Sequence, residues 1–189
     1  ATAGPAIFEN IIVVPGFEKD VWGLDLATGK HLWTFHTVPQ PGEFGFDTWD
    51  RTEPYGANCW AGMAMDEARG IAYITTGGPK PNFTGVGHLG DNLFANCVVA
   101  IDARTGTRLW HFQEIRHDLW DLDISAPPNL GTITRDATRR IDQRVHAHLA
   151  AQVPAHRGRD FQRLANQAGS NALHVGIGTF QPVKTECLE

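Results

Sequence analysis

The sequence predicts an all-β fold built from repeated four-stranded antiparallel sheets, and three observations support this prediction. A fifteen-residue hairpin signature occurs twice, as VWGLDLATGKHLWTF at residues 21–35 and as VVAIDARTGTRLWHF at residues 98–112. Short apolar or β-branched runs precede and separate the two copies, as expected for strands. Gly and Pro gather between these runs, where they mark turns and loops. Such self-similarity indicates structural units that stack on one another.

The two copies of the signature are identical at seven positions. These are a leading Val, the Asp that ends the first strand, the Thr-Gly of the turn, and the Leu, Trp and Phe of the returning strand. The Asp carboxylate can accept backbone N–H bonds in the turn, and the Gly permits a positive φ. Because side chains alternate along a strand, Trp33 and Phe35 share one face, as do Trp110 and Phe112. We predict that these rings are buried between neighbouring units.

In chain order, the first predicted strand covers residues 11–14 and ends at a Pro-Gly turn before the first hairpin. Further strands are predicted at 61–65, 71–75, 97–102 and 108–112. Residues 36–56 and 76–91 are rich in Gly and Pro, and we expect them to be long loops with a functional or packing role.

Residues 59–112 would form one complete four-stranded blade of a β-propeller, with residues 11–35 supplying the last three strands of the preceding blade. The next blade would begin at residues 127–131, so we predict about two and a half blades. The hairpins start at residues 21 and 98, which is a longer interval than the roughly 40–50 residues of a plain blade. The two long loops account for the excess.

The composition changes near Arg135. Up to that residue there are nine Lys or Arg against sixteen Asp or Glu, together with all six Trp, whereas basic residues outnumber acidic ones seven to five from Asp136 onward. We therefore predict a partial propeller at residues 1–135 and a divergent tail at residues 136–189. The tail lacks the signature, and Ile141, Val145 and Leu149 fall at helical spacing, so we expect it to be irregular or helical.

We interpret the tail as an out-of-frame or truncated continuation, or as a disordered segment, and the alternative is a genuine divergent end. The pair His146 and His148 favours a solvated stretch over a metal site. The chain starts with neither Met nor a signal peptide, so we expect a processed product or a piece of a longer protein.

Composition excludes several classes of function. The net charge of −5 argues against nucleic acid as the main partner, and no apolar run approaches the length that spans a membrane. Cys59, Cys97 and Cys187 lack the spacing of a zinc site. We favour buried thiols, with a Cys59–Cys97 disulfide left open.

The repeated Asp-x-x-Thr-Gly-x-x-Leu-Trp hairpin resembles the tryptophan-docking motif of the pyrroloquinoline quinone (PQQ) dependent dehydrogenases. Four further stretches strengthen the resemblance, namely PQPGEFGFDTW at 39–49, GANCW at 56–60, GDNLFAN at 90–96, and RHDLWDLD at 116–123 followed by APPN at 126–129. Together they are similar to the quinoprotein glucose dehydrogenase and related alcohol dehydrogenase branch. The resemblance covers residues 5–135.

The resemblance implies an eight-bladed propeller that is periplasmic, or that faces the periplasm in a membrane-associated parent. It also implies PQQ beside Ca²⁺, and oxidation of a sugar or alcohol hydroxyl. In this chemistry a carboxylate takes the hydroxyl proton and hydride passes to the quinone. The hard cation polarises the quinone oxygens, and the cofactor carries the redox step. Electrons would leave to an acceptor such as a quinone or a cytochrome.

Carried over by position, the resemblance makes Asp118 the candidate general base and a candidate Ca²⁺ ligand. The alternative for Asp118 is an Asp that caps a turn at a strand entry, and we expect that structural role for Asp121 and Asp123.

The resemblance makes Trp60 the floor under the quinone ring and Asn58 a polar contact to the quinone. For Trp60 the alternative is a core Trp between blades. Glu18 is a candidate carboxylate ligand of Ca²⁺, and the alternative is an exposed loop Glu. Relatives have Thr-Gly-Asn-Pro where this chain has TGGP at 76–79, so Gly78 lacks the Asn oxygen that binds the metal. We expect a Ca²⁺ site that is weakened or rebuilt from other oxygens.

Two functions are therefore compared. The first is an enzyme, a fragment of a PQQ-dependent sugar or alcohol dehydrogenase that is inactive on its own because two and a half blades cannot close a ring. The second is a non-catalytic propeller that serves as a binding or scaffold module. The HDLWD stretch at 117–121, with Asn58 and Trp60, favours the enzyme, and Gly78 favours the scaffold.

Overall fold

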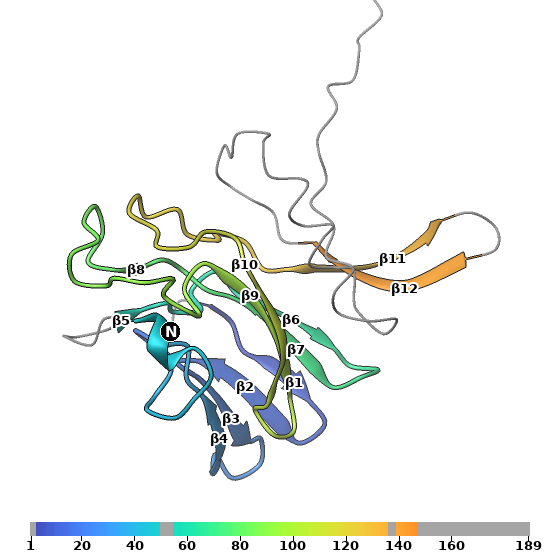
Figure 1. The fold of residues 1–189 in the computed structure, drawn as a ribbon. Coiled ribbons are helices and arrows are strands. Elements are labelled where there is room, and N and C mark those ends of the chain that lie inside the picture. Colours follow the sequence, from blue (N-terminus) through green and yellow to red (C-terminus); the bar gives the residue numbers. More distant parts are fainter. Residues whose placement is uncertain (1–2, 50–54, 136–138, 147–189) are drawn as a thin grey trace, which may run out of the picture.

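The computed structural model describes residues 3–49, 55–135 and 139–146, and nearly all of its regular structure is β-strand (Figure 1). Two four-stranded antiparallel sheets form the body of the molecule. The first has the order β1-β2-β3-β4, from Ala6–Phe8, Ile11–Pro15, Val21–Asp25 and His31–Phe35. The second has the order β10-β9-β7-β6, from Met63–Asp66 (β6), Ile71–Thr75 (β7), Cys97–Asp102 (β9) and Arg108–Gln113 (β10).

These two sheets confirm the predicted blades, and the first is more complete than expected. Strand β1 pairs with β2 and supplies a fourth strand that the sequence analysis missed, because three residues are too few to show alternation. Shorter elements complete the fold, namely β5 (Tyr55–Gly56), β8 (Pro79–Lys80) and the 3₁₀ turn η1 (Phe46–Thr48). No helix in the described part of the chain has the length and hydropathy of a membrane span.

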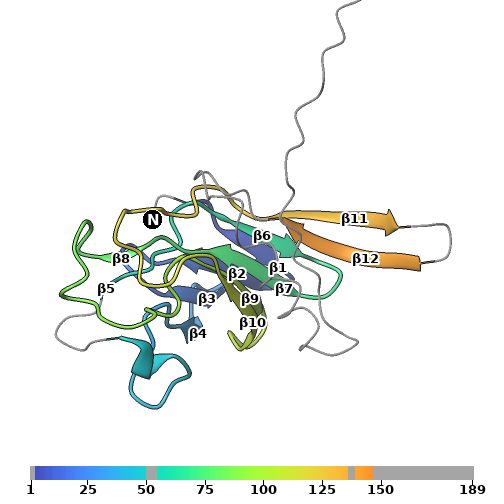
Figure 2. The ribbon, with the colours of Figure 1, turned by 45° about the horizontal axis from the view of Figure 1, so that its top comes forward.

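A third hairpin follows the second sheet. Strand β11 (Asn129–Arg135) pairs with β12 (Arg139–His146), and the hairpin extends away from the two blades in both views (Figures 1 and 2). Its start agrees with the next blade predicted near residue 127. The expected irregular or helical structure is wrong for residues 139–146, where ladder pairing with β11 overrides a short helical spacing. Residues 147–189 lie outside the described residues, and the division of the chain at residue 136 stays a prediction.

The twin hairpins share an irregularity that the repeat alone does not reveal. Gly23 pairs with Trp33 and Leu24 pairs with His31, so Leu32 is an extra residue in β4. Leu109 occupies the same place in β10, between two residues that pair with consecutive residues of β9. Such bulges turn a side chain away from the regular alternation. The repeated Leu is accordingly exposed, at 44% in the first copy and 47% in the second.

Trp33 is buried between the two blades, as predicted. Its ring lies over Gly23 in its own sheet and against Gly106 in the turn of the second hairpin, close enough that a Cβ at either glycine would overlap it. Its indole N–H donates to the Ala103 carbonyl across the interface at 3.1 Å. Around it, the facing sides of both sheets form one apolar core that includes Val21, Phe35, Ile74, Val99 and Ile101.

Trp110 lies on the opposite side of the second sheet, and both Trp110 and Phe112 are only half-buried, so the burial predicted for these two rings is met in part. Trp110 packs on the buried Tyr73, with ring centroids 5.9 Å apart, in a second cluster with Val98, Ala100 and Ile124. Each repeat therefore directs its Trp toward the unit that follows in the chain, which is the arrangement of stacked blades.

The long loop at 36–56 has a packing role. Val38 and Trp49 lie in a third apolar cluster with Ala57 and Ala95, and the Trp49 indole N–H donates to the Leu93 carbonyl. Cys59 and Cys97 are both free and buried, which confirms the preferred prediction of buried thiols. Cys187 lies outside the described residues.

We predict that Trp33→Ala lowers the free energy of unfolding by about 3–5 kcal/mol, because it leaves a cavity between the blades and an unpaired Ala103 carbonyl. Urea unfolding of the 189-residue chain measures this. Trp22→Ala is the matched control, because Trp22 in neighbouring strand β3 is 38% exposed. An equal loss of stability in both variants would contradict the role assigned to Trp33.

Candidate functional site

Three chain segments meet where the strands of the second sheet begin and end, next to β5 and β8. Backbone hydrogen bonds join them, because Gly77 N–H donates to Asn58 O at 3.0 Å and Asn96 N–H donates to Gly77 O at 2.9 Å. A further bond runs from Ala57 N–H to Gly78 O at 3.0 Å. The loops that carry the GANCW, TGGP and GDNLFAN stretches are therefore held side by side.

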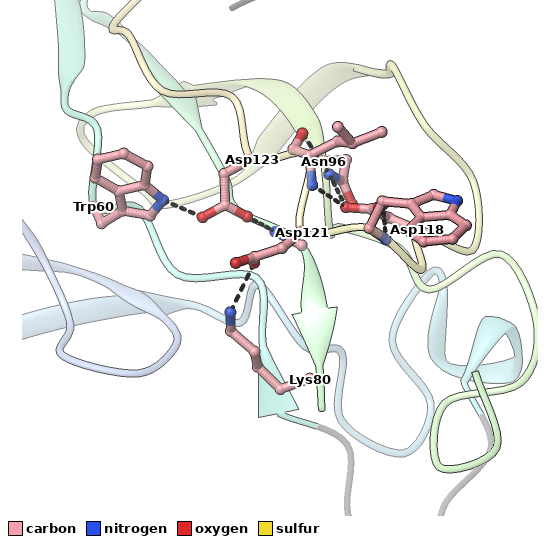
Figure 3. A network of polar contacts seen from close by, with 9 residues as sticks. Trp60, Lys80, Asn96, Asp118, Asp121 and Asp123 are labelled. Atoms are coloured by element: carbon pink, nitrogen blue, oxygen red, sulfur yellow. Dashed lines mark hydrogen bonds and ion pairs between the residues drawn. The ribbon is translucent and has the colours of Figure 1, made fainter. Parts of the chain in front are cut away.

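Asp123 links two of these loops (Figure 3). Its Oδ2 accepts a hydrogen bond from the Trp60 indole N–H at 2.7 Å, and its Oδ1 accepts one from the Gly78 backbone N–H at 2.5 Å. The half-buried Trp60 ring is therefore fixed by a carboxylate that lies 63 residues further along the chain. This differs from the predicted role of Asp123 as a turn or strand cap.

Asp118 is 3% exposed and lies beside the buried Asn96. Its Oδ2 accepts from Asn96 Nδ2 at 3.1 Å and from the Leu122 backbone N–H at 2.7 Å, while its Oδ1 accepts from the Trp120 backbone N–H at 2.9 Å (Figure 3). Such bonds are those of an Asp that orders its own loop. Asp118 thus has the contacts of the structural alternative, and its roles as base and metal ligand stay predictions.

Glycines at 77 and 78 allow the two carboxylates to approach this strand end. A Cβ at Gly77 would lie 2.9 Å from both Asp123 carboxylate oxygens. A Cβ at Gly78 would lie 3.0 Å from Asp118 Oδ2 and 3.3 Å from Asp123 Oδ1. The position where relatives carry Asn is therefore occupied here by carboxylate oxygens drawn close to the backbone.

Asp121 is the most accessible carboxylate of this loop. It is exposed, and Lys80 Nζ lies 3.0 Å from its Oδ1 (Figure 3). The ion pair brings the end of β8 to the 117–123 loop. Because both side chains of the ion pair are accessible to solvent, the pair contributes little to stability.

The two remaining predicted residues lie at the edge of this region. Asn58 donates from Nδ2 to the Phe17 carbonyl at 3.4 Å, so it touches the loop that follows β2. Glu18 is the next residue in that loop and is exposed, as its structural alternative expects. In the described part of the chain, no ion pair or hydrogen bond joins Glu18 to Asp118.

The oxygens of this region match a calcium ion only in part. Calcium takes six to eight oxygen ligands. The Asp118 and Asp123 carboxylates are already engaged by N–H donors, but Asn96 Oδ1 is buried and has no hydrogen-bond partner. Residues 3–49, 55–135 and 139–146 contain no group of three His, Cys, Asp or Glu side chains suited to a metal. Asn96 Oδ1 is thus the one oxygen that the structure adds to the predicted set.

Glu114 is an ionisable group of this region that the sequence analysis missed. Its backbone N–H donates to Asn96 O at 2.8 Å, at the place where β10 leads into the 117–123 loop. Burial raises the pKa of its carboxyl to about 7. Only burial distinguishes this Glu from an exposed one, and the sequence does not show burial.

A cavity of about 240 Å³ lies elsewhere, between the outer strands β4 and β10 and the loop at 36–45. Phe44, Phe94 and Arg108 line it, and the guanidinium lies over the Phe44 ring at 4.3 Å. Trp60, Asp118 and Asp123 do not line it. This cavity is therefore separate from the cluster of Trp60, Asp118 and Asp123.

We predict that Asp123→Ala lowers the free energy of unfolding by about 1–3 kcal/mol, because it leaves the Trp60 and Gly78 N–H groups without their acceptor. The Trp60 contribution to fluorescence should shift as well. Thermal unfolding and emission spectra measure both effects. Asp121→Ala is the matched control and should cost less than about 1 kcal/mol, because it removes only an exposed ion pair. A larger loss in the control would overturn this ranking.

We predict that the titration of Glu114 lowers the free energy of unfolding as the pH rises from about 4.5 to about 7. In this range the folded chain holds a proton that the unfolded chain has released, because burial raises the folded-state pKa from 4.5 to about 7. Glu114→Gln should therefore stabilise the chain at pH 8 and change it little at pH 4.5.

Melting temperatures of the unchanged chain and of Glu114→Gln, each measured at pH 4.5 and at pH 8, test this prediction. Burial lowers the pKa of His111 to about 4, which gives a slope of the opposite sign. This contribution is present in both proteins and cancels in their difference. An equal effect of Glu114→Gln at both pH values would refute the assignment.

Comparison with known proteins agrees with the propeller fold. The family model for the β-propeller domain of PQQ-type glucose, ethanol and alcohol dehydrogenases matches residues 3–145. Quinoprotein glucose dehydrogenase A of Acinetobacter calcoaceticus is 36% identical over 129 residues, which cover 63% of this chain and 15% of that protein. Lupanine 17-hydroxylase [cytochrome c] of a Pseudomonas species is 36% identical over 110 residues, covering 50% of this chain and 16% of that protein.

Among solved structures, the quinohemoprotein alcohol dehydrogenase of Comamonas testosteroni aligns with a TM-score of 0.63 and 26% identity. The alignment covers 75% of this chain and 24% of that one. The chain thus spans between about a seventh and a quarter of the length of these relatives. Its matched part reaches residue 145, ten residues beyond the limit predicted from the sequence. The chain belongs to the family of PQQ-dependent glucose, ethanol and alcohol dehydrogenase β-propellers.

Proposed function

We propose that this chain is part of a quinoprotein oxidoreductase that oxidises a sugar or alcohol hydroxyl by hydride transfer to PQQ with assistance from Ca²⁺. The observation that carries the proposal is the hydrogen bond between Trp60 and Asp123. It joins the GANCW stretch before β6 to the HDLWDLD stretch after β10, both of which flank the second sheet. Family membership gives these stretches a redox context, since the relatives are named as glucose and alcohol dehydrogenases.

The chain would contribute a flat surface and a polar edge to the cofactor. Asp123 fixes the Trp60 indole by its N–H, so the plane of the ring is set before any ligand arrives. Asn58 stands two residues earlier on the same segment, where its amide can turn from the Phe17 carbonyl to a ligand oxygen. When bound, PQQ supplies the quinone that accepts hydride, and Ca²⁺ withdraws electron density from its oxygens.

The proton of the substrate hydroxyl requires a carboxylate within hydrogen-bond reach. Asp118 was the base expected from the resemblance, but it is buried and accepts three N–H bonds. Asp121 lies three residues later, is exposed, and has a single lysine partner. These contacts favour Asp121 as the proton acceptor, with Asp118 holding the loop that presents it.

A calcium ion would find a partial set of oxygens here. Asn96 Oδ1 is the available ligand among the described residues, and water would supply further oxygens. We propose weak calcium binding as a consequence of Gly78. The acceptor of electrons is proposed to be a quinone or a cytochrome, the latter supported by the relative named with cytochrome c. A periplasmic location is proposed from the family resemblance alone.

A complete propeller that carries these residues tests the assignment. Asp121→Asn should reduce dye-linked turnover of glucose or ethanol by about 10²–10⁴-fold with little change in melting temperature. Asp118→Asn should instead lower the melting temperature, because it replaces an oxygen that accepts N–H bonds with a donor. The reverse pattern would return the role of base to Asp118.

PQQ binding is tested on the same protein by tryptophan fluorescence. Added PQQ and Ca²⁺ should quench emission, and Trp60→Phe should remove part of the quenching while Trp22→Phe, at an exposed position, should not. Quenching that is absent, or that is equal in both variants, would contradict a cofactor next to Trp60.

The second candidate is a propeller that binds or scaffolds without a cofactor. Gly78 in place of a metal ligand favours it, as does the lack of a three-ligand cluster among the described residues. This candidate predicts no quenching by PQQ and no turnover, with the fold unchanged.

A further inference from the structure

Two histidines from different loops face one another beside the candidate site. His88 lies in the loop between β8 and β9, and His117 lies in the loop after β10. Their imidazole rings have centroids 5.3 Å apart and planes inclined by 52°. His88 is fully buried, although its loop has no regular structure.

The tautomer of His88 follows from its neighbour Asn92. Asn92 Nδ2 donates to the His88 carbonyl at 2.6 Å and to the Leu89 carbonyl at 3.4 Å, which orients the amide with its oxygen toward the His88 ring. His88 Nδ1 lies 3.1 Å from that oxygen and therefore carries the hydrogen. Nε2 then bears a lone pair, and this buried atom has no hydrogen-bond partner among the described residues.

His117 has the same arrangement. Its Nδ1 lies 3.1 Å from the Gly90 carbonyl oxygen, which can only accept, so Nδ1 carries the hydrogen and Nε2 bears a lone pair. The Nε2 edge lies against Gly85, where a Cβ would be only 2.5 Å from Nε2. Gly85 and His88 belong to one loop, and a hydrogen bond from His88 N–H to Gly85 O at 3.4 Å holds that turn.

We propose that His88 Nε2 and His117 Nε2 bind one divalent transition-metal ion, with Zn²⁺ as the best match. In both residues Nδ1–H donates to an oxygen, so the neutral ring presents the lone pair of Nε2, which is the arrangement found around histidines that bind metals. If both Nε2 atoms bind one ion with Zn–N bonds of about 2.1 Å, each ring centre lies about 3.2 Å from it, and ring centres 5.3 Å apart then correspond to an N–Zn–N angle of about 110°. This is close to the tetrahedral angle that zinc prefers.

Imidazole nitrogen selects Zn, Cu or Ni over the hard, oxygen-binding Ca²⁺, so this site is separate from the one expected beside PQQ. Two protein ligands are available, since no third His, Cys, Asp or Glu joins them in the described part of the chain. Water would complete the coordination on the partly exposed side of His117. The ion would therefore exchange with solvent, unlike a closed four-ligand site.

The ion would join the loop before β9 to the loop that carries Asp118 and Asp121. His117 precedes Asp118 directly, and Asn92 lies four residues before Asn96, which binds Asp118. The proposal does not depend on PQQ, because it concerns how the two loops are held together.

Zinc binding to the 189-residue chain tests the proposal by isothermal titration calorimetry at pH 7.5. One site is expected, with affinity reduced at least tenfold in His88→Gln and in His117→Gln. The matched control is the double variant His146→Gln/His148→Gln, which removes the histidine pair near the end of β12 and should leave this site intact. Zinc affinity that survives both single substitutions, or that disappears in the control, would overturn the proposal.

Cobalt supplies a readout that does not depend on stability. Co²⁺ added to the chain should produce the visible absorption of a tetrahedral nitrogen-ligated ion, and His117→Gln should abolish it. Far-ultraviolet circular dichroism checks the fold of each variant. If His88→Gln unfolds the chain, the partly exposed His117 decides the outcome by itself, and an unchanged cobalt spectrum in folded His117→Gln would reject the site.

Discussion

The structure depends on one ring placed between two sheets. Trp33 lies over Gly23, reaches the Gly106 turn and donates to the Ala103 carbonyl, so a single side chain joins both blades by packing and by a hydrogen bond. A large aromatic ring can do this because its faces bury apolar area while its N–H finds an acceptor. The glycines are required, since any side chain at these positions would occupy the volume of the ring. The contact sets the relation of one blade to the next, and the inner strands β1 and β6 lie near each other as a result.

That relation positions the candidate site. The segment after β5, the segment after β7 and the segment before β9 lie together, and they are joined by hydrogen bonds through Asn58, Gly77 and Asn96. Asp118 and Asp123 then reach this cluster from the loop after β10, and the small residues Gly77 and Gly78 leave room for their oxygens. The carboxylates thus have different roles, because two are held by N–H donors and Asp121 is exposed beside Lys80. The His88–His117 pair lies on the same two loops, since His117 directly precedes Asp118 and His88 lies in the segment that leads to Asn96.

Much of this could be predicted from the sequence. The duplicated hairpin placed four of the eight blade strands and the neighbouring apolar runs placed three more, while the alternation in β4 predicted the burial of Trp33 and Phe35. The motifs also directed attention to Trp60, Asn58 and the HDLWDLD loop, which the structure brings to one region. The role of each Asp in that loop was not predictable, because three carboxylates within six residues look alike until their N–H donors are known. Asn96 and Glu114 were missed for the same reason. The role of Asn96 depends on its hydrogen bond to Asp118 in another loop, and the raised pKa of Glu114 depends on its burial.

The sequence by itself determined the all-β repeat, seven of the eight blade strands, the turn chemistry of the hairpins and the family. These features depend on patterns of residues that lie within a few positions of one another, so they can be recognised in the sequence alone. Only the tertiary structure decided that the repeated Leu is exposed on a bulge, that residues 139–146 form a strand with β11, and that Asp123 rather than Asp118 fixes Trp60. Each of those depends on which distant segment supplies the hydrogen-bond partner, and that choice is made when the blades pack.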